Sequence, residues 1–93
     1  MNTILKIGTS TCPPCQRLKP IFDKLKGEYQ DKINFDEVSD ELDYGRFEKY
    51  SVKFSIKGVP VVLIMDENEN ELERLTGLQT KKVYCEIIEK YII

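Results

Sequence analysis

The sequence predicts an α/β fold in which a mixed four-stranded sheet carries helices on both faces. Apolar runs typical of strands alternate with segments of helical periodicity, in the order strand, helix, strand, helix, strand, strand, helix. The strand–helix–strand start implies parallel strands joined by a right-handed crossover, and the short polar turn between the last two strands implies an antiparallel hairpin. The 93 residues have room for one core, so we expect a single domain over residues 1–93.

The first half of the chain contains the expected parallel strands. Residues 3–8, Thr-Ile-Leu-Lys-Ile-Gly, form a short apolar run that is typical of a buried strand. A helix is expected over residues 12–28, because N-cap residues precede it and proline is tolerated in a first helical turn. Its apolar face consists of Leu18, Ile21, Phe22 and Leu25. Pro20 should kink this helix, residues 27–31 should form a turn, and residues 32–38 alternate like a second strand.

A second, shorter helix is expected over residues 41–50. Ser39 or Asp40 precedes it and would serve as its N-cap. Its apolar positions are Leu42, Phe47 and Tyr50. Residues 53–58 then connect this helix to the next strand.

The second half of the chain contains the hairpin and a last helix. Residues 59–65, Val-Pro-Val-Val-Leu-Ile-Met, give the strongest strand signal in the sequence. The polar residues 66–70 form the expected turn, residues 71–75 form a shorter strand, and Gly77 ends it. A helix is expected from Thr80, as its N-cap, to Tyr91. Its apolar face consists of Val83, Tyr84, Ile87, Ile88 and Tyr91.

Composition excludes several classes of function. The net charge of −2, with scattered basic residues, gives no basic surface for nucleic acid or anionic lipid. The longest nearly apolar run, residues 59–65, is too short to span a bilayer, and no export signal is visible at the start. We therefore expect a monomeric cytoplasmic protein that binds neither membrane nor nucleic acid.

Cys12 and Cys15 form the pattern that carries chemistry. A zinc site would need two further ligands, but histidine is absent and Cys85 is the only other cysteine. We therefore expect no metal, and Cys85 is interpreted as a small buried hydrophobic residue. The pair follows a predicted strand and opens a predicted helix, which is the context of a redox dithiol.

Helix geometry suggests a role for each cysteine. The attacking species in disulfide exchange is the thiolate, and the positive end of a helix favours the anion at Cys12. Cys15 lies one turn along the helix and is expected to lie deeper, so an external disulfide should meet Cys12 first. Cys12 is therefore predicted to be the nucleophile and Cys15 the resolving thiol.

Three spaced motifs resemble the thioredoxin superfamily. They are Cys12-Pro13-Pro14-Cys15 with Pro20 five residues later, Lys57-Gly58-Val59-Pro60, and Gly77 after the hairpin. The resemblance implies a thioredoxin fold without the N-terminal strand and helix of full-length thioredoxins. It also implies that Pro60 is cis and faces the dithiol, that the Val59 backbone pairs with an extended substrate segment, and that Gly77 gives substrates room.

The activity implied by the resemblance is reduction of protein disulfides, a form of electron transport. No cofactor is expected to be bound, because the redox-active group is the disulfide itself. The external reductant would be either thioredoxin reductase with NADPH or glutathione. Two alternatives stay open: a glutathione-dependent glutaredoxin, although residues 76–80 offer no acidic residue for glutathione, and a non-catalytic binding module.

The sequence departs from the thioredoxin pattern around the dithiol. Thr11 stands where the family has Trp, and it is expected to be a helix cap or a rim residue. Lys6 stands where thioredoxins have a buried aspartate that accepts the proton of the resolving thiol. Glu37 stands on the next strand where they have lysine, so a charge-swapped pair in which Glu37 accepts the proton is one interpretation. The other is that Lys6 extends to solvent. Pro13 and Pro14 together remove two backbone N–H groups from the dithiol loop.

Overall fold

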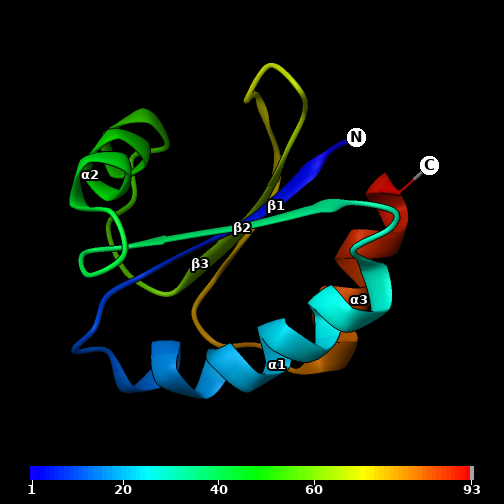
Figure 1. Ribbon diagram of the computed structural model, residues 1–93, viewed down its shortest axis with the longest axis horizontal. Helices are drawn as coiled ribbons and strands as arrows, with labels where there is room; N and C mark the ends of the chain where they lie inside the picture. The colour runs from blue at the N-terminus through cyan, green and yellow to red at the C-terminus, as the bar shows by residue number, and fades with distance from the viewer. Residues whose placement is uncertain (93) are drawn as a thin grey trace.

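The computed structural model describes residues 1–92 and has the predicted architecture. Its elements are β1 (Thr3–Gly8), α1 (Pro13–Tyr29), β2 (Asn34–Ser39), α2 (Tyr44–Lys53), β3 (Val61–Met65), β4 (Glu71–Thr76) and α3 (Lys81–Tyr91). The strand order in the sheet is β2-β1-β3-β4, with β1 and β2 parallel and the other two pairs antiparallel. In Figure 1, α2 covers one face of the sheet, and α1 and α3 cover the other.

The core consists of two apolar layers, one on each face of the sheet. Successive side chains of β1 alternate between them: Ile4 packs with α1 and α3, whereas Leu5 and Ile7 pack with α2. By the same alternation Lys6 faces α1, and its Nζ lies 5.1 Å from the centre of the Phe22 ring. A lysine thus occupies an inward position next to the larger of the two cores.

The start of α2 differs from the prediction. The helix begins at Tyr44 and its N-cap is Asp43, whose carboxylate accepts a hydrogen bond from Arg46 N at 3.1 Å. Ser39 accepts from Leu42 N and so forms a turn before the helix. The prediction of a helix over residues 41–50 capped by Ser39 or Asp40 was wrong at its start. The loop offers a third cap residue, Asp43, and the helix uses that one.

Other boundaries differ by a few residues. The helix α1 continues past residue 27 to Tyr29, so the predicted turn is displaced and begins at Gln30. The strand β2 starts at Asn34, and β3 starts at Val61, directly after the cis peptide bond between Val59 and Pro60. At α3 the predicted cap is confirmed, since Thr80 accepts from Val83 N.

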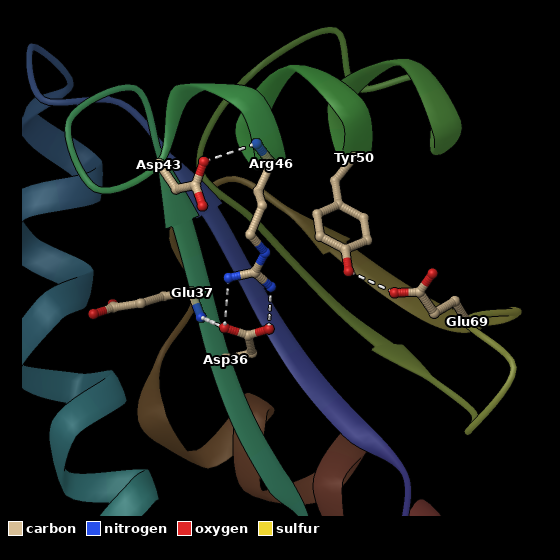
Figure 2. Close-up of polar contacts among 6 residues, drawn as sticks. All are labelled: Asp36, Glu37, Asp43, Arg46, Tyr50 and Glu69. Atoms are coloured by element: carbon tan, nitrogen blue, oxygen red, sulfur yellow. Dashed lines mark hydrogen bonds and ion pairs between the residues drawn. The ribbon is translucent and has the colours of Figure 1, made fainter.

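A polar network ties α2 to both edges of its sheet face (Figure 2). Arg46 pairs with Asp36 on β2, and the hydroxyl of Tyr50 donates to Glu69 in the β3–β4 turn. Glu37 points away from this network, toward the opposite face of the sheet. The network fixes where α2 sits against the strands that lead to the dithiol.

Replacement of Tyr50 by phenylalanine should destabilise the protein at neutral pH. The hydroxyl lowers the pKa of Glu69 below its ordinary value of 4.5, so this contribution is present above that pH and is lost on acidification. We expect a loss of about 1 kcal/mol in the free energy of unfolding at pH 7, shrinking at pH 3, in urea titrations. Tyr44→Phe is the matched control, because Tyr44 is 62% exposed. Equal losses for Tyr50→Phe at both pH values would contradict this explanation.

Candidate active site

The dithiol lies at the start of α1, where Cys12 and Cys15 are joined as a disulfide. Cys12 is the N-cap of the helix, and its Sγ accepts a hydrogen bond from Cys15 N at 3.2 Å. Pro13 and Pro14 occupy the first two helical positions and have no N–H. The third helical residue, Cys15, therefore provides the first helical N–H that reaches the Cys12 sulfur. When the disulfide is reduced, a thiolate at Cys12 would lie at the positive end of the helix, which favours an anion.

The substrate-binding residues predicted by resemblance lie close to one another, and Val59 contacts Cys12. The Cys12 Sγ lies 3.8 Å from the carbonyl oxygen of Val59, and the Val59–Pro60 bond is cis. Gly77 N donates to the carbonyl oxygen of Pro60 at 2.8 Å, so the end of β4 is held against this loop. Gly77 has φ of +83°, a conformation that favours glycine. Thr11, next to Cys12, is exposed as expected of a rim residue.

The opposite side of the dithiol borders a cavity of about 310 Å³. Cys15, Gly8 and Pro60 line it, and so do Lys6 and Glu37. A Cβ atom at Gly8 would lie only 3.1 Å from the Cys15 Sγ, so the absence of a side chain there lets the Cys15 side chain pack closely against the end of β1. The Cys15 side of the disulfide therefore faces a hollow, whereas the Cys12 side faces the Val59 loop.

The relative exposure of the two cysteines is the reverse of the prediction. Cys12 is 9% exposed, whereas Cys15 is half-buried, so the expectation that Cys15 lies deeper was wrong for the disulfide form. The Val59 carbonyl oxygen, 47 residues away in sequence, approaches the Cys12 sulfur to 3.8 Å, a tertiary contact that the sequence pattern did not predict.

Lys6 and Glu37 form an ion pair at the wall of the cavity. They are direct partners in the parallel register of β1 and β2, and Lys6 Nζ lies 2.8 Å from Glu37 Oε2. The Lys6 side chain is only 13% exposed, so it does not extend freely to solvent, and Glu37 is the more exposed partner at 45%. The structure thus brings the two residues together beside Cys15, as the charge-swapped interpretation requires.

One contact of the dithiol loop was missed by sequence reasoning. Asp40 accepts hydrogen bonds from the backbone N and the Oγ of Ser10, at 2.9 and 3.1 Å, and Gln16 Nε2 donates to the Ser10 carbonyl. The carboxyl ends of the parallel strands β1 and β2 meet at one edge of the sheet, which is the signal that could have found it. The contact anchors the loop that leads into Cys12.

Other chemistry is limited in the part of the chain that the structure describes. Within residues 1–92, no cluster of three or more cysteine, aspartate or glutamate side chains is arranged to hold a metal ion. Among the described helices, none has the length and apolar character needed to cross a bilayer.

Cys85 is half-buried and packs against the core between the sheet, α1 and α3, so it is less buried than predicted.

Comparison with known proteins identifies sequence relatives over nearly the whole chain. A family model described as Thioredoxin matches residues 2–90. NADPH-dependent thioredoxin reductase 3 of Arabidopsis thaliana is 37% identical over 89 residues, which are 95% of this chain but 16% of that protein. A thioredoxin of Staphylococcus saprophyticus is 27% identical over 81 residues, which are 87% of this chain and 73% of that protein.

Solved structures agree on the fold. The thioredoxin pre-protein of Schistosoma mansoni superposes with a TM-score of 0.81 at 20% identity, covering 98% of this chain and 79% of the other. Thioredoxin NaTrxh of Nicotiana alata gives a TM-score of 0.83 at 18% identity, covering 99% and 74%. At 18–20% sequence identity, these superpositions show a shared fold.

Proposed function

The chain belongs to the thioredoxin family and is a thiol–disulfide oxidoreductase, and on that premise we propose that it reduces disulfide bonds of other proteins through Cys12 and Cys15. The observation that carries the proposal is the hydrogen bond from Cys15 N to the Cys12 sulfur at the start of α1. A donor at the positive end of a helix stabilises a thiolate, and the thiolate is the attacking species. Cys12 is therefore the nucleophile, despite its low exposure.

The reaction consists of two exchange steps. The Cys12 thiolate attacks one sulfur of the substrate disulfide, which forms a mixed disulfide and releases the first substrate thiolate. Cys15, once deprotonated, then attacks the Cys12 sulfur and releases the second substrate thiolate. Two electrons pass from the dithiol to the substrate, and the product is the Cys12–Cys15 disulfide.

Substrate is proposed to lie along the loop opposite Cys12. The Val59 carbonyl lies beside the Cys12 sulfur, and the Gly77–Pro60 hydrogen bond holds the end of β4 against this loop. An extended segment that flanks a disulfide can pair with such backbone by strand addition, which depends little on side chains. Thr11 and the exposed Pro13 would form the rim that the substrate crosses. The specificity of the protein would then be broad.

Glu37 is proposed to accept the proton of Cys15, with Lys6 holding the carboxylate in place. Cys15, Lys6 and Glu37 border the same cavity, which provides room for a water molecule between the carboxylate and the thiol. The 2.8 Å ion pair holds Glu37 beside Lys6, at the wall of the cavity that Cys15 also lines. Lys6 acts through Glu37 and is a positioning residue.

Glu37→Gln should slow disulfide reduction in a pH-dependent way. The amide keeps the shape of the side chain but cannot accept the proton, so we expect a rate about tenfold lower at pH 7. The difference should shrink toward pH 9, above the ordinary thiol pKa of about 8.5, where Cys15 ionises without help. Turnover of insulin disulfides measured from pH 6 to 9 tests this, with the exposed Glu48→Gln as control. Unchanged rates for Glu37→Gln across this range would refute the role.

Recycling by a thioredoxin reductase with NADPH is proposed as the route back to the dithiol. The relative named NADPH-dependent thioredoxin reductase 3 supports it, since 95% of the chain aligns with that protein. The protein is further proposed to act as a monomeric single domain in the cytoplasm. Insulin reduction with NADPH and a thioredoxin reductase should proceed at catalytic concentrations of the protein. Activity confined to a hydroxyethyl-disulfide assay with glutathione would instead indicate a glutaredoxin, and binding of partners without turnover would indicate a binding module.

A further inference from the structure

Tyr84 is a completely buried tyrosine for which the exchange steps provide no role. It lies on α3 with no exposed surface, in the apolar layer between α1, α3 and the sheet. A hydroxyl in such surroundings costs free energy unless it is hydrogen-bonded, and a leucine or phenylalanine would fill the position without that cost. The partners of the hydroxyl therefore show what the tyrosine does.

The Tyr84 hydroxyl binds the loop between β4 and α3 at two points. It accepts a hydrogen bond from Gln79 N at 3.1 Å and donates to the carbonyl oxygen of Gly77 at 3.5 Å. Burial raises the pKa of Tyr84, so the phenol stays protonated at neutral pH and keeps its hydrogen for donation. One side chain of α3 thus holds both ends of segment 77–79.

This segment is joined in turn to the loop opposite the dithiol. Gly77 N donates to the carbonyl oxygen of Pro60 at 2.8 Å. The carbonyl oxygen of Val59, one residue before Pro60, lies 3.8 Å from the Cys12 sulfur. A Cβ atom at Gly77 would meet no atom of a non-neighbouring residue within 4 Å, so packing does not hold Gly77 on that side. Its hydrogen bonds with Pro60 and Tyr84 restrain it, and the open side stays free.

We propose that Tyr84 is a positioning residue for protein substrates: its hydroxyl holds segment 77–79 in the conformation that leaves room for an extended polypeptide beside Cys12. The inference rests on the proposed function, because it requires a polypeptide to lie along this loop. The hydrogen bonds of Tyr84 reach the site through Gly77 and Pro60 and do not include a sulfur. Tyr84 therefore acts on the binding of the polypeptide and not on the exchange of sulfurs.

Tyr84→Phe separates the binding of polypeptide from the exchange chemistry. The variant loses the hydrogen bonds of the hydroxyl to the loop, so we expect the second-order rate constant for oxidation of the reduced protein by insulin disulfides to fall about fivefold. The small disulfide dithiobis(nitrobenzoate) has no polypeptide to bind, so its rate constant with the same variant should stay unchanged. The midpoint potential of the dithiol should not move either. Rapid mixing of pre-reduced protein with each disulfide measures both rate constants without a reductase.

Tyr91→Phe is the matched control on the same helix. Tyr91 packs against the same apolar layer, and its hydroxyl donates to Glu73 on β4 at 2.9 Å. Tyr91 is the last residue of α3, whereas Tyr84 lies near its start, so Tyr91→Phe should leave both rate constants unchanged. An equal fall with insulin and with the small disulfide in Tyr84→Phe would overturn the proposal. A fall with insulin in Tyr91→Phe as large as in Tyr84→Phe would do the same.

Amide hydrogen exchange provides a second test that begins with the unaltered protein. The Gln79 amide is bonded to a buried hydroxyl, so it should be protected in the unaltered protein and lose that protection in Tyr84→Phe. Rapid exchange of the Gln79 amide in the unaltered protein would overturn the proposal. Failure of the unaltered protein to reduce insulin would overturn the proposed function and the inference with it. Equal activity of the unaltered protein and Tyr84→Phe on insulin would overturn the inference alone.

Discussion

Cys12→Ser is expected to abolish reduction of protein disulfides, whereas Cys15→Ser should stop the reaction one step later. Without Cys12 no thiolate sits at the helix N-cap, so the first exchange does not occur. Without Cys15 the first exchange proceeds, but nothing resolves the mixed disulfide. The Cys15→Ser variant should therefore accumulate a covalent complex with its substrate through Cys12.

Non-reducing gels and mass spectrometry after incubation with oxidised insulin measure both outcomes. Cys85→Ser is the matched control, because Cys85 packs on α3 away from the dithiol, and it should retain turnover. Efficient trapping of substrate by Cys12→Ser, through Cys15, would reverse the assignment of the nucleophile. Comparing the two variants is informative because Cys15 is the more exposed cysteine and is therefore the competing candidate for the nucleophile.

Leu63→Ala is expected to cause a large loss of stability. Leu63 is fully buried in the central strand β3, on the face packed against α2. Truncation removes apolar contacts and leaves a cavity that the sheet cannot close, at a cost of about 2–5 kcal/mol in the free energy of unfolding. Urea denaturation followed by far-UV circular dichroism measures it.

The same substitution at an exposed position is the control. Leu42 is 63% exposed in the loop before α2, so Leu42→Ala should change the free energy of unfolding by no more than about 0.5 kcal/mol. Similar losses for the two variants would mean that the core does not lie where the structure places it.

The fold could be predicted because the strong signals are local. Residues 3–8 are apolar and become β1 with the predicted bounds, and the cap at Thr80 starts α3 where expected. The start of α2 could not be predicted, because Ser39, Asp40 and Asp43 all compete as caps. A tertiary contact engages Asp40, which accepts from Ser10 N, and Asp43 caps the helix locally by accepting from Arg46 N.

The active site was predictable to the extent that it depends on spacing and register. The two cysteines lie one turn apart at the helix start, and the Lys6–Glu37 pair follows from the alignment of two parallel strands. The relative exposure of the two cysteine residues was not predictable. It depends on tertiary packing, such as the contact of the Cys12 sulfur with a carbonyl 47 residues away in sequence.

The midpoint potential of the Cys12–Cys15 couple tests the central claim most directly. Equilibration with defined ratios of reduced and oxidised dithiothreitol or glutathione, followed by alkylation, measures it. A protein that reduces the disulfides of others should have a potential near about −270 mV, in the range of thioredoxin. A value near about −120 mV, typical of a dithiol that donates disulfides, would contradict the assignment of this protein as a reductase.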